Sequence, residues 1–148
     1  MSHGNVSHHM QVSLHPSIDH SQFHLYSGFG QQLYPIVSMG GSGVIDGMAA
    51  FFPKTVVRLY NLAISLPTDE AQMKEIGGLQ FAVSSMEEWI GSYGIAGIKV
   101  AIAKVLGMGE LENRAPIVNN VGDEEWKQWK EQVQRMKGIE DSLGEERK

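Results

Sequence analysis

The sequence predicts an α/β fold with parallel strands, and three observations point to it. Short segments with strand character alternate with helical ones, in the order helix, strand, helix, strand and then four helices. Parallel strands require crossover connections, and this alternation supplies helices for them. Hydrophobic residues make up 42% of the 148 residues, which is enough for a packed core. Two parallel strands alone leave both sheet edges open, so we expect part of a larger fold.

The first half of the chain is predicted to hold both strands. Residues 22–26 alternate polar and apolar side chains, as a short strand does, and a Gly-rich turn follows. Residues 31–39 have helical character, with Pro35 near the first turn, where proline is tolerated. Val44 and Ile45 form the centre of the second predicted strand.

The second half is predicted to be helical. Pro53 is placed as the first residue of one helix, and Thr68 as the N-cap of the next. Gly94 is expected near the end of that second helix, Gly107 ends a third, and Asp123 caps a fourth. The expected core stripes are Val56, Leu59, Tyr60 and Ala63; Ile76, Leu79, Val83, Met86 and Ile90; Ile95, Ile98, Ile102, Val105 and Leu106; and Trp126, Trp129, Val133 and Met136.

Composition excludes several classes of protein. The formal charge is 12 − 17 = −5, whereas a nucleic-acid binder normally carries a basic face. The absence of cysteine excludes a disulfide scaffold, a cysteine zinc site and a catalytic thiol. We see no secretory signal and no apolar run near the ~18 residues of a membrane span. The expectation is a soluble cytoplasmic protein without nucleic-acid or membrane partners.

Histidine clustering invites a metal site, because all six histidines lie within the first 24 residues. No pair spaced by four falls on one face of a predicted helix, and Asp19 is the one nearby carboxylate. We therefore expect no metal and interpret these histidines as surface or pocket-edge residues.

Three further patterns suggest functional sites but fit structural roles better: a glycine pair, a lysine pair and a tryptophan pair. Gly28 and Gly30 begin a dinucleotide fingerprint, but Leu33 stands where the third glycine belongs, so no nucleotide cofactor is expected. Lys99 and Lys104 occupy polar helix positions beside an apolar stripe, which is typical of solvated lysines. The Trp126/Trp129 pair is interpreted as a packing anchor.

Three segments resemble parts of a known family. Residues 26–28 read Tyr-Ser-Gly, and residues 40–45 read Gly-Gly-Ser-Gly-Val-Ile at the spacing of strands seven and eight in the dihydrodipicolinate synthase and N-acetylneuraminate lyase superfamily. Residues 2–6 resemble the segment after strand six in the aldolases of that superfamily. Residues 97–107 and 114–116 resemble its C-terminal helical extension. The resemblance covers residues 1–136 and is strongest to L-threo-3-deoxyhexulosonate aldolase.

The resemblance implies the C-terminal half of a TIM (β/α)8 barrel, strands seven and eight, plus the helical extension. A whole barrel takes about 250 residues. On this interpretation residues 1–66 belong to the barrel, residues 67–138 form the extension, and residues 139–148 are a charged tail that frays.

The family chemistry is a class I aldol reaction, in which a lysine amine forms a Schiff base with pyruvate or a keto-acid substrate. The resemblance places that lysine on strand six, immediately before Met1, so we expect no catalytic residue within this chain. By the same resemblance Ile45 matches an isoleucine whose backbone contacts pyruvate. Gly28 and Gly43 match glycines that allow close backbone approach, and His3 would line the pocket mouth.

The resulting hypothesis is a lyase-family protein: the C-terminal portion of a pyruvate-dependent aldolase acting on a keto-deoxy sugar acid, inactive as this chain and a homo-oligomer like the family tetramers. Phe29 and Gly30 replace the Asp-Asp pair of dihydrodipicolinate synthases, which disfavours that enzyme. Two alternatives stay open: a dihydrodipicolinate synthase-like enzyme, and a non-catalytic interaction module whose barrel edges pair with a partner chain.

Overall fold

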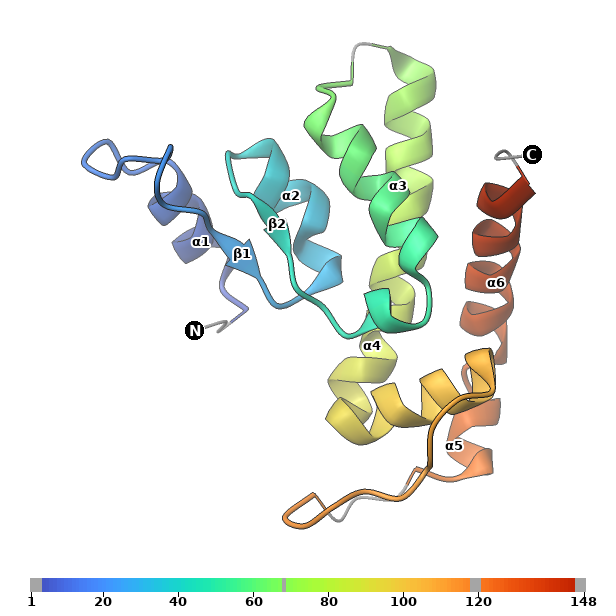
Figure 1. Cartoon of the computed structure of the whole chain (residues 1–148). Helices are drawn as coiled ribbons and strands as arrows, with labels where there is room; N and C mark the ends of the chain where they lie inside the picture. The colour runs from blue at the N-terminus through green and yellow to red at the C-terminus, as the bar shows by residue number, and fades with distance from the viewer. Residues whose placement is uncertain (1–3, 68, 118–120, 146–148) are drawn as a thin grey trace.

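A computed structural model of the chain describes residues 4–67, 69–117 and 121–145 (Figure 1). This part is helix-rich and contains one small parallel sheet. Its elements are α1 (Val6–Ser13), β1 (Tyr26–Ser27), the 3-10 helix η1 (Gly30–Gln32), α2 (Leu33–Ser38), β2 (Gly43–Val44), the 3-10 helix η2 (Met48–Ala50), α3 (Pro53–Ile64), α4 (Glu70–Leu106), α5 (Asp123–Lys127) and α6 (Lys130–Glu145).

The sheet confirms the predicted parallel pairing. Tyr26 lies opposite Gly43 and Ser27 opposite Val44, with α2 as the crossover between the two strands. The first strand is shorter than predicted and shifted toward its C-terminal end. The reason is local: the Asp19 side chain accepts the Ser21 N–H at 3.0 Å and holds the segment before residue 23 in a turn.

The core lies among the helices on one side of the sheet. α3 packs between α2, α4 and α6, while α1 and α2 lie beside the strands (Figure 1). The stripes of the other predicted helices lie mostly in this core, but the stripe predicted after Gly94 is wrong. None of its members is buried: Ile95 and Leu106 are 59% and 45% exposed, and Ile98, Ile102 and Val105 are partly buried. Ala96, Val100 and Ala101 form the buried face instead, because the non-helical Gly94 interrupts the helical period. The fully buried large side chains are Trp89, Phe51, Phe52, Leu33, Ile36, Met48, Leu59, Ile76, Met86, Met136, Val83 and Val100.

α4 bends sharply where the sequence predicts a break. Gly94 has φ 58° and ψ −141°, a conformation that favours glycine, and the helix changes direction there (Figure 1). Trp89 bridges the bend by donating its indole N–H to the Gly97 carbonyl at 2.9 Å. The helix ends at Gly107, as predicted, in the left-handed conformation. Its N-cap is Asp69, whose carboxylate accepts the N–H of Gln72; Thr68, the predicted cap, lies outside the described residues.

The C-terminal segment differs from prediction in two ways. The single predicted helix is divided into α5 and α6, and Asp123 is not the cap: Gly122 precedes α5, while Asp123 pairs with Lys104 at 2.6 Å. Past Gly138 the chain does not fray but continues as α6 to Glu145. A tertiary contact accounts for this, because Glu140 binds the N-terminus of α3.

α4 is also the one helix in the described part that has the length and hydropathy of a membrane span. Its most apolar 18-residue window has a mean hydropathy of 1.3, and 28% of that window is buried. From the sequence we expected no apolar run near the length of a membrane span. By length and composition, α4 does not meet that expectation. Core helices of soluble proteins pass the same test, and α4 packs against α3, α6 and both 3-10 helices.

Candidate functional site

The C-terminal ends of the two strands lie side by side. The Ile45 N–H donates to the Ser27 carbonyl at 2.8 Å, so the chain leaves both strands in register at Gly28 and Ile45. In parallel α/β folds, ligands bind at this end of the strands. The Ile45 residue is 75% exposed, and the turns that follow, residues 28–30 and 45–47, form the candidate site.

A buried polar network fixes the turn after β1. The Ser27 hydroxyl donates to Gln32 Oε1 at 2.6 Å and accepts the Phe29 N–H at 3.2 Å. Gln32 Nε2 donates in turn to the Gly4 carbonyl at 2.8 Å. Ser27 and Gln32 are both buried, so these bonds form away from competing water. The segment before α1 is thereby tied to the turn after β1.

The four predicted substrate-binding residues occupy different places. Gly28 and Ile45 are brought together at the strand ends. Gly43 lies at the other end of β2, where its φ of 144° and the Tyr60 ring, 3.4 Å from a Cβ built on it, favour glycine. His3 lies outside the described residues; its neighbour Gly4 is the one that Gln32 binds.

Sequence reasoning missed two carboxyl groups beside these turns. Asp46 follows Ile45 directly, and Glu87 reaches the same place from α4 with 3% of the residue exposed. Burial raises the pKa of Glu87, and the neighbouring Asp46 raises it further, to about 7. A signal was present: Glu87 falls inside the apolar stripe of α4, where a charged side chain is unusual.

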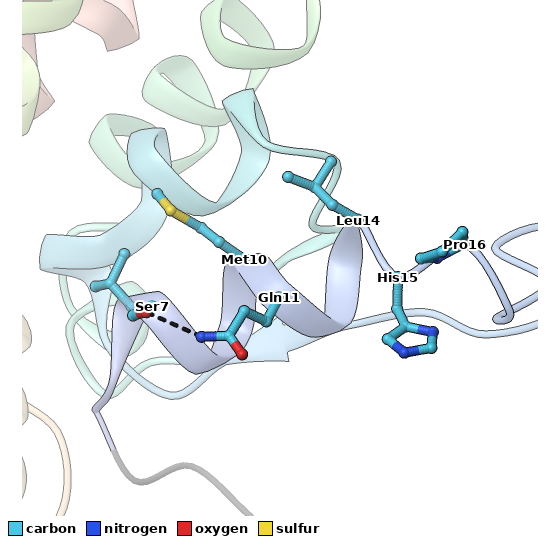
Figure 2. Close-up of a pocket in the computed structure, with 7 residues that line it drawn as sticks. Ser7, Met10, Gln11, Leu14, His15 and Pro16 are labelled. Atoms are coloured by element: carbon cyan, nitrogen blue, oxygen red, sulfur yellow. Dashed lines mark hydrogen bonds between the residues drawn. The ribbon is translucent and has the colours of Figure 1, made fainter.

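Metal binding finds no support in the described residues, which contain no group of three or more His, Cys, Asp and Glu side chains placed to hold an ion. His15 lies instead at a shallow hollow along the outer face of α1, where Gln11 Nε2 donates to the Ser7 hydroxyl at 3.2 Å (Figure 2). Met10, Leu14 and Pro16 supply apolar lining there. This hollow belongs to a helix and is distinct from the strand ends.

The two lysines that the sequence analysis interprets as solvated side chains have structural partners. The Lys99 ammonium donates to the Glu112 carbonyl, and Lys104 pairs with Asp123 at 2.6 Å. The Trp126/Trp129 pair packs on Trp89, with ring centroids 5.1 and 6.0 Å away in edge-to-face arrangement, in agreement with its interpretation as an anchor.

Comparison with curated proteins finds a relative over part of the chain. No family model matches the chain. Over 53 residues, 36% of this chain, it is 42% identical to 4-hydroxy-tetrahydrodipicolinate synthase 1 of Clostridium acetobutylicum, and the matched segment is 17% of that protein.

Comparison with solved structures covers nearly the whole chain. The 4-hydroxy-tetrahydrodipicolinate synthase of Methylacidiphilum fumariolicum SolV matches 98% of it, with a TM-score of 0.77 and 20% identity. A variant of the 2-keto-3-deoxygluconate aldolase of Sulfolobus solfataricus matches 97%, with a TM-score of 0.71 and 21% identity. The chain spans less than half of the length of either, 45% and 46% respectively.

These findings define the fold: the chain is folded like part of each of these two TIM-barrel enzymes. The sequence match shows that one segment of the chain, 53 residues long, is similar to a 4-hydroxy-tetrahydrodipicolinate synthase.

Proposed function

We propose that the chain is the C-terminal portion of a class I, pyruvate-dependent aldolase that cleaves a keto-deoxy sugar acid, with strands seven and eight as β1 and β2. The observation that carries this proposal is the agreement in fold along 97% of the chain with a 2-keto-3-deoxygluconate aldolase. The register of Gly28 and Ile45 at adjacent strand ends supports their role in presenting backbone to the keto acid. A soluble cytoplasmic location and a homo-oligomeric state belong to the same proposal.

By itself this chain is proposed to be inactive. The reaction needs an unprotonated lysine amine that attacks the substrate carbonyl and later, as an iminium, accepts the electrons of the broken C–C bond. The first lysine in the sequence is Lys54, on α3 beside α6, and Lys99 and Lys104 are held by Glu112 and Asp123. None of these three amines adjoins the turns after β1 and β2.

A sugar-acid substrate, of the L-threo-3-deoxyhexulosonate type, is favoured over that of dihydrodipicolinate synthase. The Asp-Asp pair that follows the Ser-Gly turn in the synthases is replaced by Phe29 and Gly30. An aspartate at position 30 would displace the Asp46 side chain, because a Cβ there would overlap Asp46 Oδ2 and lie 3.2 Å from Val83 Cγ1. The local packing thus supports Phe29 and Gly30 as part of a substrate site that differs from the site of the synthases.

Borohydride trapping tests the proposal. The chain is incubated with pyruvate and sodium borohydride, and its intact mass is measured, with 2-keto-3-deoxygluconate aldolase as the positive control. We expect the control to gain one reduced pyruvate and this chain to gain none. Labelling of this chain would overturn its proposed inactivity. A second test extends the coding sequence upstream of Met1. A lysine at the strand-six position, together with cleavage of a deoxyhexulosonate by the extended protein, would support the enzymatic assignment.

One observation favours a second function, a non-catalytic interaction module. Tyr26 and Ile45, on the two strands or next to them, are 47% and 75% exposed, and a two-stranded sheet leaves both edges open to pairing. A protein that binds another chain through these edges would be monomeric alone and would form a defined complex with a strand-bearing partner. An extended chain that is active without such a partner would exclude this function.

A further inference from the structure

A buried carboxyl group connects the helical part of the chain to both turns that follow the strands. Glu87, on α4, lies next to the N–H groups of Gly30, the first residue of η1, and of Met48, the first residue of η2. Gln80, earlier on the same helix, donates to the Gly30 carbonyl at 3.2 Å and accepts the Tyr34 N–H at 2.9 Å. Both turns are therefore docked on α4 through polar side chains.

Asp46 reaches the same place from the turn after β2. Its Oδ1 accepts the Ala49 N–H at 2.8 Å, whereas its Oδ2 and the Oε1 of Glu87 are buried and have no hydrogen-bond partner. A Cβ built on Gly30 would overlap Asp46 Oδ2 and lie 3.2 Å from Glu87 Oε1. The two unpartnered oxygens thus face the same side of Gly30.

The surroundings of these oxygens suit a proton better than a metal ion. Val83 Cγ1 and Gly30 itself occupy the adjoining space, and no third His, Cys, Asp or Glu side chain joins the pair among the described residues. A hard divalent cation would need six or so oxygen ligands. A proton needs only a donor and an acceptor oxygen, and it removes one of two charges that are costly to bury together.

We propose that Asp46 and Glu87 share one proton and form a pH-sensitive latch between α4 and the turns after β1 and β2. While the proton is bound, the singly charged pair holds the turns against the helix. When it is lost, repulsion between two buried carboxylates loosens that contact. The latch stands on its own geometry and does not depend on the enzymatic function proposed above.

The charged groups around the pair agree with this assignment. Burial is the larger cause of the raised pKa of Glu87, and Asp46 is the charged neighbour that raises it further, while the N–H groups of Gly30 and Met48 act in the opposite direction. η1 and η2 carry no ionisable side chain, and Glu88, the next residue of α4, is exposed. Arg58 of α3 and Arg135 of α6 face α4 at Glu75 and Phe81, on its earlier turns. Among the residues described, the pair thus has no cation placed to neutralise it.

The sign of the pH effect follows from the raised pKa. In the unfolded chain Glu87 titrates in its ordinary range, whereas in the folded chain it holds its proton to about pH 7. Between these values the folded state binds more protons, so its stability decreases as pH rises. Above the folded pKa the loss from this group is complete. Burial raises the pKa of Asp46 as well, which acts in the same direction.

The test combines a direct titration with a variant series on the full chain. The side-chain carboxyl carbons of glutamate are followed by NMR from about pH 4 to pH 9, and melting temperatures are measured for wild type, Glu87→Gln, Asp46→Asn and the exposed control Glu88→Gln. We expect one buried glutamate to titrate near neutrality, and its pKa to fall in Asp46→Asn. Relative to Glu87→Gln, wild type should lose several degrees of melting temperature between acidic and mildly alkaline pH, while Glu88→Gln should follow wild type.

Two results would overturn the latch: titration of Glu87 in the range of an exposed glutamate, or parallel pH profiles for wild type and Glu87→Gln. Should a variant fail to fold, the titration of the wild-type carboxyl group decides the question alone.

Discussion

The strand ends and the core of the helical region differ in how far their apolar side chains are buried. Beside the strands, Tyr26 is 47% exposed and Ile45 is 75% exposed, whereas Trp89 and Met136 of the helices are 0% exposed. Since apolar burial is the main source of stability, the helices around α3 and α4 hold the fold together. The strand ends, where the proposed site lies, contribute less to stability and remain accessible. The predictions below test this division.

Removal of the aromatic anchor should give the largest loss of stability. Trp89 packs on Trp126, Trp129 and Tyr93 and binds the Gly97 carbonyl across the bend of α4. Trp89→Ala leaves a cavity and an unpaired carbonyl, and we expect a loss of about 3–5 kcal/mol in the free energy of unfolding. Denaturant titration measures it. Phe81→Ala, at a 61% exposed position of the same helix, is the control and should cost far less. Equal losses would contradict a core centred on Trp89.

Loss of the cap that Glu140 of α6 provides at the N-terminus of α3 should give the second-largest loss of stability. Glu140 accepts the N–H groups of Lys54 and Thr55 at 2.8 and 2.9 Å and the Thr55 hydroxyl at 2.7 Å, at the N-terminus of α3. Glu140→Ala removes these acceptors, and we expect a loss of about 1–2 kcal/mol, as for other helix caps. Chemical denaturation gives the value. As a control, Glu140→Gln keeps an acceptor oxygen and should retain part of the stability. An unchanged free energy of unfolding in Glu140→Ala would mean that the cap is formed only weakly in solution.

The helices were largely predictable because their stripes repeat every three to four residues. Leu59, Val83 and Met136 are buried as the stripes predict, and Pro53 and Gly107 mark helix ends correctly. The errors had different causes: the first strand is shortened by a local turn at Asp19, whereas the end of α6 depends on a distant residue. Nothing near Gly138 in the sequence indicates that α6 continues, because its stabilising partner is the N-terminus of α3.

The candidate site was predictable only in part. The parallel strands follow from the alternation of elements, and Gly28 and Ile45 were selected through a family resemblance, not through their side chains. Asp46 and Glu87 are far apart in the sequence, and only packing of α4 on the turns brings them together. Asp46 is the sole charged residue between residues 26 and 53, a local signal that gains meaning once its partner is known.

A surface ion pair should contribute much less than the core. Arg58 donates from Nε and Nη2 to the two carboxylate oxygens of Glu75 at 2.7 and 2.9 Å, joining α3 to α4. The pair is about 40% exposed, so water and salt weaken it. A double-mutant cycle with Arg58→Gln and Glu75→Gln should give a coupling energy below ~1 kcal/mol that decreases in high salt. A large, salt-independent coupling would mean that this part of the helical core relies on charge.

The smallest effect on stability should come from the strand end itself. Ile45→Lys places a charge at a side chain that is already exposed, so the free energy of unfolding should change by less than ~0.5 kcal/mol. The same change should reduce self-association measured by light scattering, because it interrupts an apolar surface next to open sheet edges. Ile95→Lys, at a 59% exposed position of α4, is the matched control from the helical region. A large destabilisation by Ile45→Lys alone would show that the strand end is buried in solution, against another copy or another chain, and the division between a supporting helical region and an accessible strand region would then fail.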